Sequence, residues 1–212
     1  MRYKMVIFDL DGTILNTIED LCSACNAALD QFKLERIDVS KTMAYLGHGI
    51  KHLVYEASQH SKHIDLLLNE FKAYYSTHFN DATKPYQEID ELLKWCLKEN
   101  LIVGVLTNKV EGIARALCEA HFPLVFSFIY GEVPNRKRKP DATFLLEVLK
   151  QYQISCSEVL YIGDSEVDIA LCQNAGIDGL FVSYGFRKKE SLLAHTNQIV
   201  DTPAGIKKFL MR

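Results

Sequence analysis

The sequence predicts an α/β fold, in which a three-layer core with a parallel sheet carries an inserted all-helical cap. Short apolar runs alternate with segments of helical spacing, and this alternation is typical of a parallel sheet covered by helices on both faces. A stretch without any convincing strand, roughly residues 17–82, separates the first apolar run from the second. We therefore expect a core of residues 1–15 and 83–212 and a helical cap of residues 16–82.

Each expected strand is a short apolar run that is followed by polar or turn-forming residues. The runs are residues 5–8, 101–106, 125–130, 159–162, 179–183 and 198–200. Helical spacing marks residues 86–98, 111–120 and 166–174, and Gly176 is a usual stop for the last of these helices. Pro140 is expected to open one more helix, because proline suits the first helical position.

The bulk composition argues against several classes of protein. The 212 residues suit one α/β domain or a core with a modest insertion, and 48% hydrophobic residues can bury a sizeable core. A formal net charge of −3 argues against a nucleic-acid partner, and the basic run 136–139 is too short to change this. No apolar run reaches the ~20 residues of a membrane-spanning helix, and the N-terminus has no signal-peptide pattern. We expect a cytoplasmic protein without a membrane partner, either a monomer or a homodimer.

The six cysteines need a separate interpretation, because Cys22 and Cys25 have the CxxC spacing. A structural zinc site would need two more ligands, and no second cysteine pair or close Cys/His pair supplies them. A redox dithiol is expected at a helix start directly after a strand, whereas this pair lies inside a predicted helix. The sequence favours six reduced, partly buried thiols.

Polar side chains follow the predicted strands at the edge of the sheet where parallel strands end, and ligands bind beyond this edge. These residues are far apart in the sequence, yet the topology gathers them in one crevice. They are Asp9 and Asp11, Thr107 and Asn108, Lys139, and Asp164 and Asp168.

Asp9 and Asp11 leave the first strand two residues apart and point in similar directions, and Gly12 permits the sharp turn that follows. Two carboxylates about 4 Å apart repel by about 4 kcal/mol at an effective dielectric of about 20, and Asp164 adds to this crowding. A divalent cation relieves the repulsion, and ligands that are all oxygen favour Mg²⁺ over zinc. The alternative interpretation is an acidic turn that caps a helix.

Thr107 and Lys139 are the candidates for binding an anion. The Thr107 hydroxyl, with nearby backbone N–H groups and Asn108, can hold phosphate oxygens, and the alternative is that this turn caps the following helix. Lys139 is the favoured cation because Pro140 fixes its place at the expected helix entry, and Lys137 is the competing candidate.

Asp164 and Asp168 follow the buried run 159–162. Asp164 comes at the strand end and can bind a metal directly. Asp168 lies one helical turn further on, where it is better placed to support Asp164 or to contact Lys139. Both acids also suit a helix start, where the helix dipole favours negative charge.

With these motifs the chain resembles the haloacid dehalogenase superfamily, in its cap-bearing phosphatase branch. All four motifs of that family have a counterpart in the expected order, and the resemblance covers nearly the whole chain. The counterparts are Asp9-Leu10-Asp11-Gly12-Thr13, then Thr107, then Lys139, then Gly163-Asp164 with Asp168. The resemblance implies a Rossmann-like core and an activity toward phosphate esters.

Further details are similar to the phosphoglycolate-phosphatase-like group of that superfamily. They are Asn16-Thr17, Gly47-His48-Gly49, Ala175-Gly176 and Ser183-Tyr184-Gly185-Phe186. There are two departures: Ala142 stands where the third motif often has a second proline, and Tyr184 stands where the group often has a tryptophan. Neither position carries a reacting atom, but both weaken the assignment of one particular substrate.

The resemblance implies a two-step hydrolysis. Asp9 attacks phosphorus and becomes an aspartyl phosphate, and Asp11 protonates the leaving alcohol and then activates water. Mg²⁺ is expected to be held by Asp9, the backbone carbonyl of Asp11, and Asp164. The groups expected at the phosphoryl group are Thr107, Asn108, Lys139 and Gly12; the positioning residue is Asp168; the substrate-facing cap loop is Gly47, His48 and Gly49.

The expected substrate is a small phosphorylated metabolite, for which the resemblance favours 2-phosphoglycolate. A sugar phosphomutase of the β-phosphoglucomutase kind shares every core motif, and a pyrophosphatase of the same fold is a further alternative. A non-enzymatic phosphate-receiver module is disfavoured by Asp11 and the large cap. A dehalogenase is disfavoured because Asp11 and the metal site serve phosphoryl chemistry.

Overall fold

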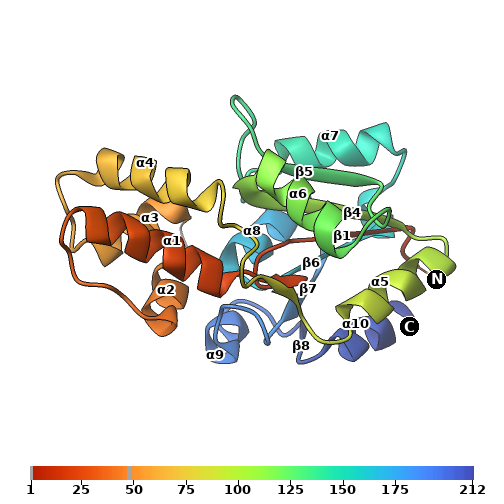
Figure 1. Ribbon diagram of the computed structural model, residues 1–212. Coiled ribbons are helices and arrows are strands. Elements are labelled where there is room, and N and C mark those ends of the chain that lie inside the picture. Colours follow the sequence, from red (N-terminus) through yellow and green to blue (C-terminus); the bar gives the residue numbers. More distant parts are fainter. Residues whose placement is uncertain (1, 47–48) are drawn as a thin grey trace. The chain divides into compact units, whose positions relative to one another are not determined.

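The computed structural model describes residues 2–46 and 49–212 (Figure 1). The chain divides into two compact units. The core unit comprises Met1–Leu15 and Pro85–Arg212, and the cap unit comprises Asn16–Lys84. The chain passes from one unit to the other at two short strands, β2 (Leu15–Asn16) and β3 (Lys84–Pro85).

The core unit is built on a six-stranded sheet with the order β5-β4-β1-β6-β7-β8, and every neighbouring pair is parallel. Its strands are β1 (Met5–Phe8), β4 (Ile102–Val110), β5 (Phe128–Glu132), β6 (Val159–Gly163), β7 (Asp178–Val182) and β8 (Ile199–Val200). The central strand β1 is buried along its whole length, as expected for a strand covered on both faces. The parallel sheet confirms the predicted fold class.

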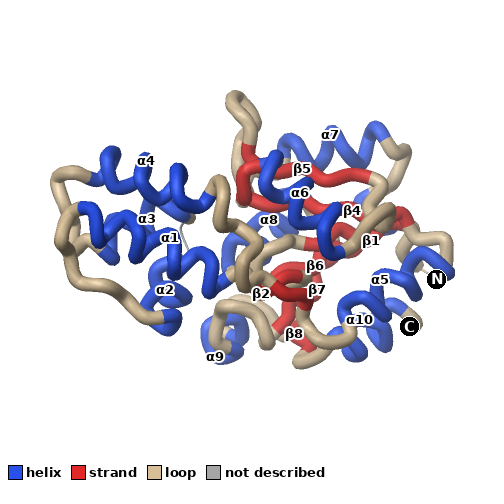
Figure 2. Tube along the Cα trace, viewed as in Figure 1, coloured by secondary structure: helices blue, strands red, loops and turns tan. Residues whose placement is uncertain are grey.

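Helices cover both faces of this sheet (Figure 2). They are α5 (Ile89–Lys98), α6 (Glu111–His121), α7 (Thr143–Gln151), α8 (Glu166–Ala175), α9 (Lys189–Leu193) and α10 (Pro203–Leu210), with a 3₁₀ turn at Cys156–Glu158. Right-handed crossovers place α5 and α6 on one face, and α7 and α8 on the other. The contact between α7 and α8 agrees with this division, and α5 packs against α10.

The face under α7 and α8 carries a continuous apolar core. Met5 and Ile7 of β1 meet Leu145 of α7 and Ile169 of α8 there, and all four are almost completely buried. Tyr161 of β6 lies in the same cluster and is the largest side chain of the described residues that is fully buried. This packing fixes the positions of the strands. It therefore also fixes the positions of the polar residues that follow their carboxyl ends.

The expectation that Pro140 opens a helix is wrong. The backbone N–H of Asp141 donates to the carbonyl of Arg138 at 3.0 Å, so the chain makes a turn there, and the Lys139–Pro140 peptide bond is cis. The Asp141 carboxylate then accepts the N–H of Thr143 at 2.9 Å, and α7 begins at Thr143.

Several other boundaries differ from the sequence expectation. Helix α5 begins at Ile89, three residues later than expected. Strand β4 continues beyond Leu106 to Val110, with an irregular register between these two residues. Strand β5 begins at Phe128, three residues later than expected, because Leu124 adopts a positive φ of 63° in a preceding turn. Helices α9 and α10 were not predicted. The start of α10 nevertheless carries two usual signals, a capping residue, Thr202, and a proline, Pro203, at the first helical position.

The cap unit contains four helices in its described residues: α1 (Ile18–Gln31), α2 (Val39–Tyr45), α3 (Ile50–Ala57) and α4 (Ile64–Tyr75). The buried carboxylate of Asp20 on α1 accepts the backbone N–H of Ala82 and of Thr83, each at 2.9 Å, and ties the two ends of the unit together. Of the predicted cap loop, Gly47 and His48 lie outside the described residues, and Gly49 immediately precedes α3.

Cys22 and Cys25 lie within α1, and all six cysteines are free thiols. Among the residues that the structure describes, no helix combines the length and the apolar character that crossing a membrane requires.

Candidate active site

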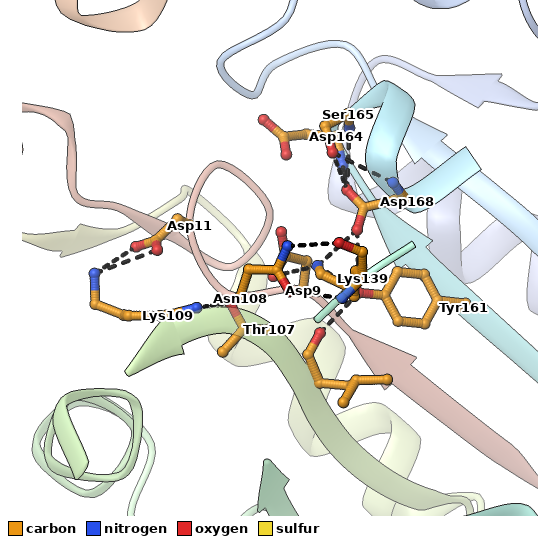
Figure 3. Close-up of polar contacts among 11 residues, drawn as sticks. Asp9, Asp11, Thr107, Asn108, Lys109, Lys139, Tyr161, Asp164, Ser165 and Asp168 are labelled. Atoms are coloured by element: carbon orange, nitrogen blue, oxygen red, sulfur yellow. Dashed lines mark hydrogen bonds and ion pairs between the residues drawn. The ribbon is translucent and has the colours of Figure 1, made fainter. Parts of the chain in front are cut away.

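The polar residues predicted at the strand ends lie at the carboxyl edge of the core sheet (Figure 3). Asp9 follows β1, Lys139 follows β5, and Asp164 and Asp168 follow β6. Oxygen atoms of the carboxylates Asp9, Asp164 and Asp168 lie within 4.8 Å of one another, and all three residues are buried. Segments separated by more than 150 positions in the sequence therefore form one acidic cluster.

Lys139 supplies the positive charge of this cluster. Its ammonium nitrogen lies 2.7 Å from Asp168 Oδ1 and 2.9 Å from Asp9 Oδ1. It also donates to the hydroxyl of Tyr161 at 2.9 Å. Lys137, the competing candidate, is exposed and pairs with Asp141 at 3.1 Å, so Lys139 is the lysine that lies against Asp9.

The side chain of Asn108 holds the backbone of Lys139. Its amide nitrogen donates to the Lys139 carbonyl at 3.0 Å, and its oxygen accepts the Lys139 N–H at 2.8 Å. Because both hydrogen bonds join Asn108 to the Lys139 backbone, the end of β4 fixes the point from which the Lys139 side chain extends.

Both oxygens of Asp168 are occupied by protein donors. Oδ1 receives Lys139 at 2.7 Å and lies 3.2 Å from the Tyr161 hydroxyl. Oδ2 accepts the hydroxyl of Ser165 at 2.6 Å and the backbone N–H groups of Ser165 and Asp164 at 3.1 and 3.2 Å. This carboxylate caps α8 and orients Lys139, which leaves little capacity for another ligand.

The carboxylate of Asp164 sits between two glycines. A Cβ atom at Gly12 or at Gly185 would clash with its oxygen, and Gly12 has a φ of 79°, in the left-handed region that favours glycine. The backbone N–H of Phe186 donates to Asp164 Oδ2 at 2.7 Å. The two glycines therefore allow the loop of the first motif and residues 185–186 to close around one acidic side chain.

Burial and mutual repulsion perturb these groups. Burial, together with the charges of Asp168 and Asp11, raises the pKa of Asp9 to about 6 against the opposing effect of Lys139. Burial, then the charges of Asp168 and Asp9, raise the pKa of Asp164 well above its usual range. Burial lowers the pKa of Lys139, but the charges of Asp168 and Asp9 outweigh it and raise that pKa overall.

The cluster suits a hard divalent cation. Three buried carboxylates face one ammonium group, so negative charge is in excess, and every candidate ligand atom is oxygen. Asp9 Oδ1 is buried, and its contact with Lys139 is an ion pair without an aligned hydrogen bond, so this oxygen retains lone pairs for a further partner. Asp9 and Asp164 are the carboxylates with free capacity, and their donor chemistry fits Mg²⁺.

Asp11 is oriented differently from Asp9. Its carboxylate turns toward Lys109 at the end of β4, with Nζ–O distances of 2.9 and 3.2 Å (Figure 3). Lys109 is buried, and its backbone N–H donates to the hydroxyl of Thr107 at 3.3 Å. The acid/base candidate is thus paired with a lysine that sequence reasoning did not select.

Sequence reasoning missed two residues of the site. Lys109 lies two positions after Thr107, a spacing that in a regular strand puts both side chains on one side, and this spacing was an available signal. Tyr161 is an aromatic residue with a polar tip inside the otherwise aliphatic strand Val159–Gly163.

Tyr184, one of the two departures from the related group, donates its hydroxyl hydrogen to the carbonyl of Thr13 at 3.1 Å and supports the first-motif loop.

The parallel sheet and the buried acidic cluster at its carboxyl edge suit an enzyme that acts on phosphate esters. The sequence matches the haloacid dehalogenase-like hydrolase family over residues 6–182, and the chain belongs to this family. It is 30% identical over 193 residues to a phosphoglycolate phosphatase of Mesorhizobium japonicum, covering 88% of this chain and 85% of the relative. It is 33% identical over 216 residues to the N-acetylmuramic acid 6-phosphate phosphatase of Pseudomonas aeruginosa, covering 96% and 92%.

A solved structure supports the same assignment. The crystal structure of a proposed phosphoglycolate phosphatase from Lactobacillus delbrueckii superposes with a TM-score of 0.87 at 30% identity, covering 98% of each chain. The resemblance to the phosphoglycolate-phosphatase-like group is confirmed. The protein is a phosphatase of the haloacid dehalogenase-like family that acts on a phosphorylated small molecule.

Proposed function

We propose that this phosphatase is Mg²⁺-dependent and hydrolyses a small phosphomonoester through an aspartyl phosphate on Asp9. The observation that carries the proposal is the buried carboxylate of Asp9, held 2.9 Å from the Lys139 ammonium and beside Asp164. A carboxylate in this position meets the two needs of a nucleophile, a fixed location and a neighbouring cation that attracts the phosphoryl group.

In the first step Asp9 attacks phosphorus in line, and the bond to the leaving alcohol breaks. Asp11 supplies the proton that the departing alkoxide needs. In the second step Asp11 takes a proton from water, which attacks phosphorus and releases inorganic phosphate and Asp9. Because Asp11 is paired with Lys109 in the structure, its carboxylate has to turn from that lysine toward the leaving oxygen.

The phosphoryl group is bound by the hydroxyl of Thr107 and the ammonium group of Lys139, with Gly12 allowing close approach of the first-motif loop. Asn108 acts by holding the backbone of Lys139. Asp168 orients Lys139 and the start of α8. Mg²⁺ would be held by Asp9, the backbone carbonyl of Asp11, and Asp164, and when bound it neutralises charge among the crowded oxygens.

The substrate proposed first is 2-phosphoglycolate, because phosphoglycolate phosphatases recur among the relatives. N-acetylmuramic acid 6-phosphate is a second candidate, because the relative that acts on it matches 96% of this chain at 33% identity. The two molecules differ greatly in size while presenting the same phosphomonoester to the core site.

A substrate panel with Mg²⁺ tests the proposal. Phosphate release is measured from 2-phosphoglycolate, N-acetylmuramic acid 6-phosphate, glucose 1-phosphate and pyrophosphate. We expect the highest kcat/KM with 2-phosphoglycolate and no turnover after chelation. Formation of glucose 6-phosphate without release of phosphate would instead identify a mutase, and turnover that persists in the chelator would refute the metal requirement.

The covalent intermediate is tested separately. Rapid quenching during turnover of a ³²P-labelled substrate is expected to leave label on the peptide that contains Asp9, and hydroxylamine is expected to release it as from an acyl phosphate. Label that is absent even from Asp11→Asn with an aryl substrate, where the second step is expected to be slow, would contradict the two-step route.

A further inference from the structure

Tyr161 is a polar residue at a position where the fold requires only an apolar one. It lies in the middle of β6, between β1 and β7, and its side chain is completely buried. Its ring packs in the apolar core beneath α7 and α8, and its hydroxyl reaches the carboxyl edge of the sheet, where the acidic cluster lies (Figure 3). A buried hydroxyl destabilises the fold unless it has partners.

The Tyr161 hydroxyl contacts three separate segments of the site. It donates to the carbonyl of Leu106 at 2.7 Å, accepts from Lys139 Nζ at 2.9 Å, and lies 3.2 Å from Asp168 Oδ1. A phenol has a single proton, and the shorter distance assigns that proton to Leu106. Burial and the charge of Asp168 raise the pKa of Tyr161 well above its usual range, so the group stays a neutral donor.

The contact with Lys139 completes the surroundings of its ammonium group. An ammonium has three N–H donors, and the nitrogen of Lys139 faces three oxygens, those of Asp9, Asp168 and Tyr161. Two hydrogen bonds and one ion pair therefore hold the nitrogen in place. Among the residues that the structure describes, the partners left to the nitrogen without the Tyr161 hydroxyl would be two carboxylates, one of which is the proposed nucleophile.

The contact with Leu106 acts on a different phosphate-binding group. The carbonyl of Leu106 belongs to the same planar peptide unit as the nitrogen of Thr107. A hydrogen bond that fixes this carbonyl therefore fixes the orientation of the Leu106–Thr107 peptide plane, and with it the position of the Thr107 backbone nitrogen. This matters because β4 loses its regular register between Leu106 and Val110, where sheet pairing alone does not impose the backbone direction.

We propose that Tyr161 is a positioning residue for phosphoryl transfer, whose hydroxyl fixes the Lys139 ammonium and the Leu106–Thr107 peptide relative to Asp9. The inference rests on the proposed function, in which Lys139 and Thr107 bind the transferring group. It adds one element to it: a single buried hydroxyl links the second, third and fourth motifs.

The test is Tyr161→Phe, with Tyr152→Phe as the matched control. Tyr152 packs against the same core. Its hydroxyl donates to the Ser127 carbonyl at a distance of 3.3 Å and is not part of the acidic cluster. We expect Tyr161→Phe to lower kcat by about 10- to 100-fold while KM changes little, because misplaced phosphate ligands weaken mainly the transition state. The inhibition constant of orthovanadate, which mimics that state, should rise in parallel, while that of inorganic phosphate should hardly change.

The outcomes separate this inference from the proposed function. If the wild-type protein releases phosphate from none of the panel substrates with Mg²⁺, the proposed function is wrong. If the wild type and Tyr152→Phe are active and folded Tyr161→Phe matches them in kcat and vanadate affinity, the positioning role is wrong. A kcat that falls only with the folded fraction, at unchanged vanadate affinity, also contradicts it, because that result describes a purely structural tyrosine.

A second variant covers the case in which Tyr161→Phe does not fold. Replacement of Tyr161 by 4-fluorophenylalanine refills the volume of the hydroxyl without an O–H donor. The same loss of kcat and of vanadate affinity is expected, and wild-type values in this folded variant would overturn the inference.

Discussion

Two buried lysines at the same edge of the sheet pair with the two aspartates of the first motif in different ways. Lys139 binds Asp9 and Asp168, whose side chains are 11% and 0% exposed. Lys109 binds Asp11, whose side chain is 21% exposed. In the proposed mechanism, the enclosed group suits the nucleophile, which needs a fixed position. The more open pair suits the proposed acid/base, which has to reach the leaving group and then water.

The largest effect is expected at the enclosed pair. Asp9→Asn should lower kcat by at least about 10⁴-fold, because an amide does not form the acyl phosphate intermediate. Steady-state turnover and the circular dichroism spectrum measure activity and fold. Asp201→Asn, a change at an exposed aspartate paired with Lys189, is the control and should leave kcat unchanged. Turnover of Asp9→Asn within tenfold of the wild type would show that another group is the nucleophile.

The open pair should respond according to the leaving group. Asp11→Asn is expected to lower kcat by about 10³-fold on an alkyl phosphate, within the range of general acid–base catalysis. The first step should suffer much less with 4-nitrophenyl phosphate, whose phenolate leaves without a proton. Burst kinetics on the aryl substrate would then show rapid formation and slow hydrolysis of the intermediate. An equal loss in both steps for both substrates would contradict the acid/base role.

The two lysines can be compared directly by the same substitution. Lys139→Met should lower kcat by about 10²-fold and destabilise the fold, because Asp9 and Asp168 would remain buried without their cation. Lys109→Met should lower kcat by roughly tenfold or less and affect stability less, because Asp11 can reach solvent. Kinetics and urea unfolding of both variants measure this. If Lys109→Met proved the more damaging change in kcat and stability, the contrast between the two pairs would be wrong.

The sequence predicted the parts of this site that depend on strand ends. Asp9 and Asp164 each follow an apolar run directly, so recognising the run also locates the acid. The choice between Lys137 and Lys139 remained open, because it depends on a turn whose geometry Pro140 did not reveal. The expected helix start at Pro140 was wrong for the same reason. The hydrogen bond from the Thr143 N–H to the Asp141 carboxylate marks the start of α7.

The missed residues share a different cause. Tyr161 bonds to Leu106 across 55 positions, and Lys109 binds Asp11 across 98. No local pattern encodes such pairs, because the register of neighbouring strands brings them together. An isolated polar tip in an apolar strand was nevertheless visible at Tyr161, and buried polar groups require partners.

The smallest expected effect concerns stability rather than rate, and it tests whether the enclosed cluster is designed for a cation. The pKa of Asp164 is raised in the folded protein by burial and by the charges of Asp168 and Asp9. The folded state therefore binds this proton more tightly than the unfolded state. Without metal, stability should fall as pH rises above the ordinary aspartate pKa of about 4 and through the raised folded value.

Asp164→Asn removes this carboxylate, so the chelated variant should melt at a higher temperature than the chelated wild type at pH 8, and the difference should shrink toward pH 4. Each kcal/mol corresponds to about 2–4 °C in a chain of this size. Mg²⁺ should stabilise the wild type more than the variant, because a ligand of the folded state stabilises in proportion to its binding. Melting curves at both pH values, with EDTA and with Mg²⁺, decide the matter. If the variant melts below the wild type at pH 8 in EDTA, repulsion among the buried carboxylates does not destabilise the metal-free protein, and it is not the reason that this cluster favours a cation.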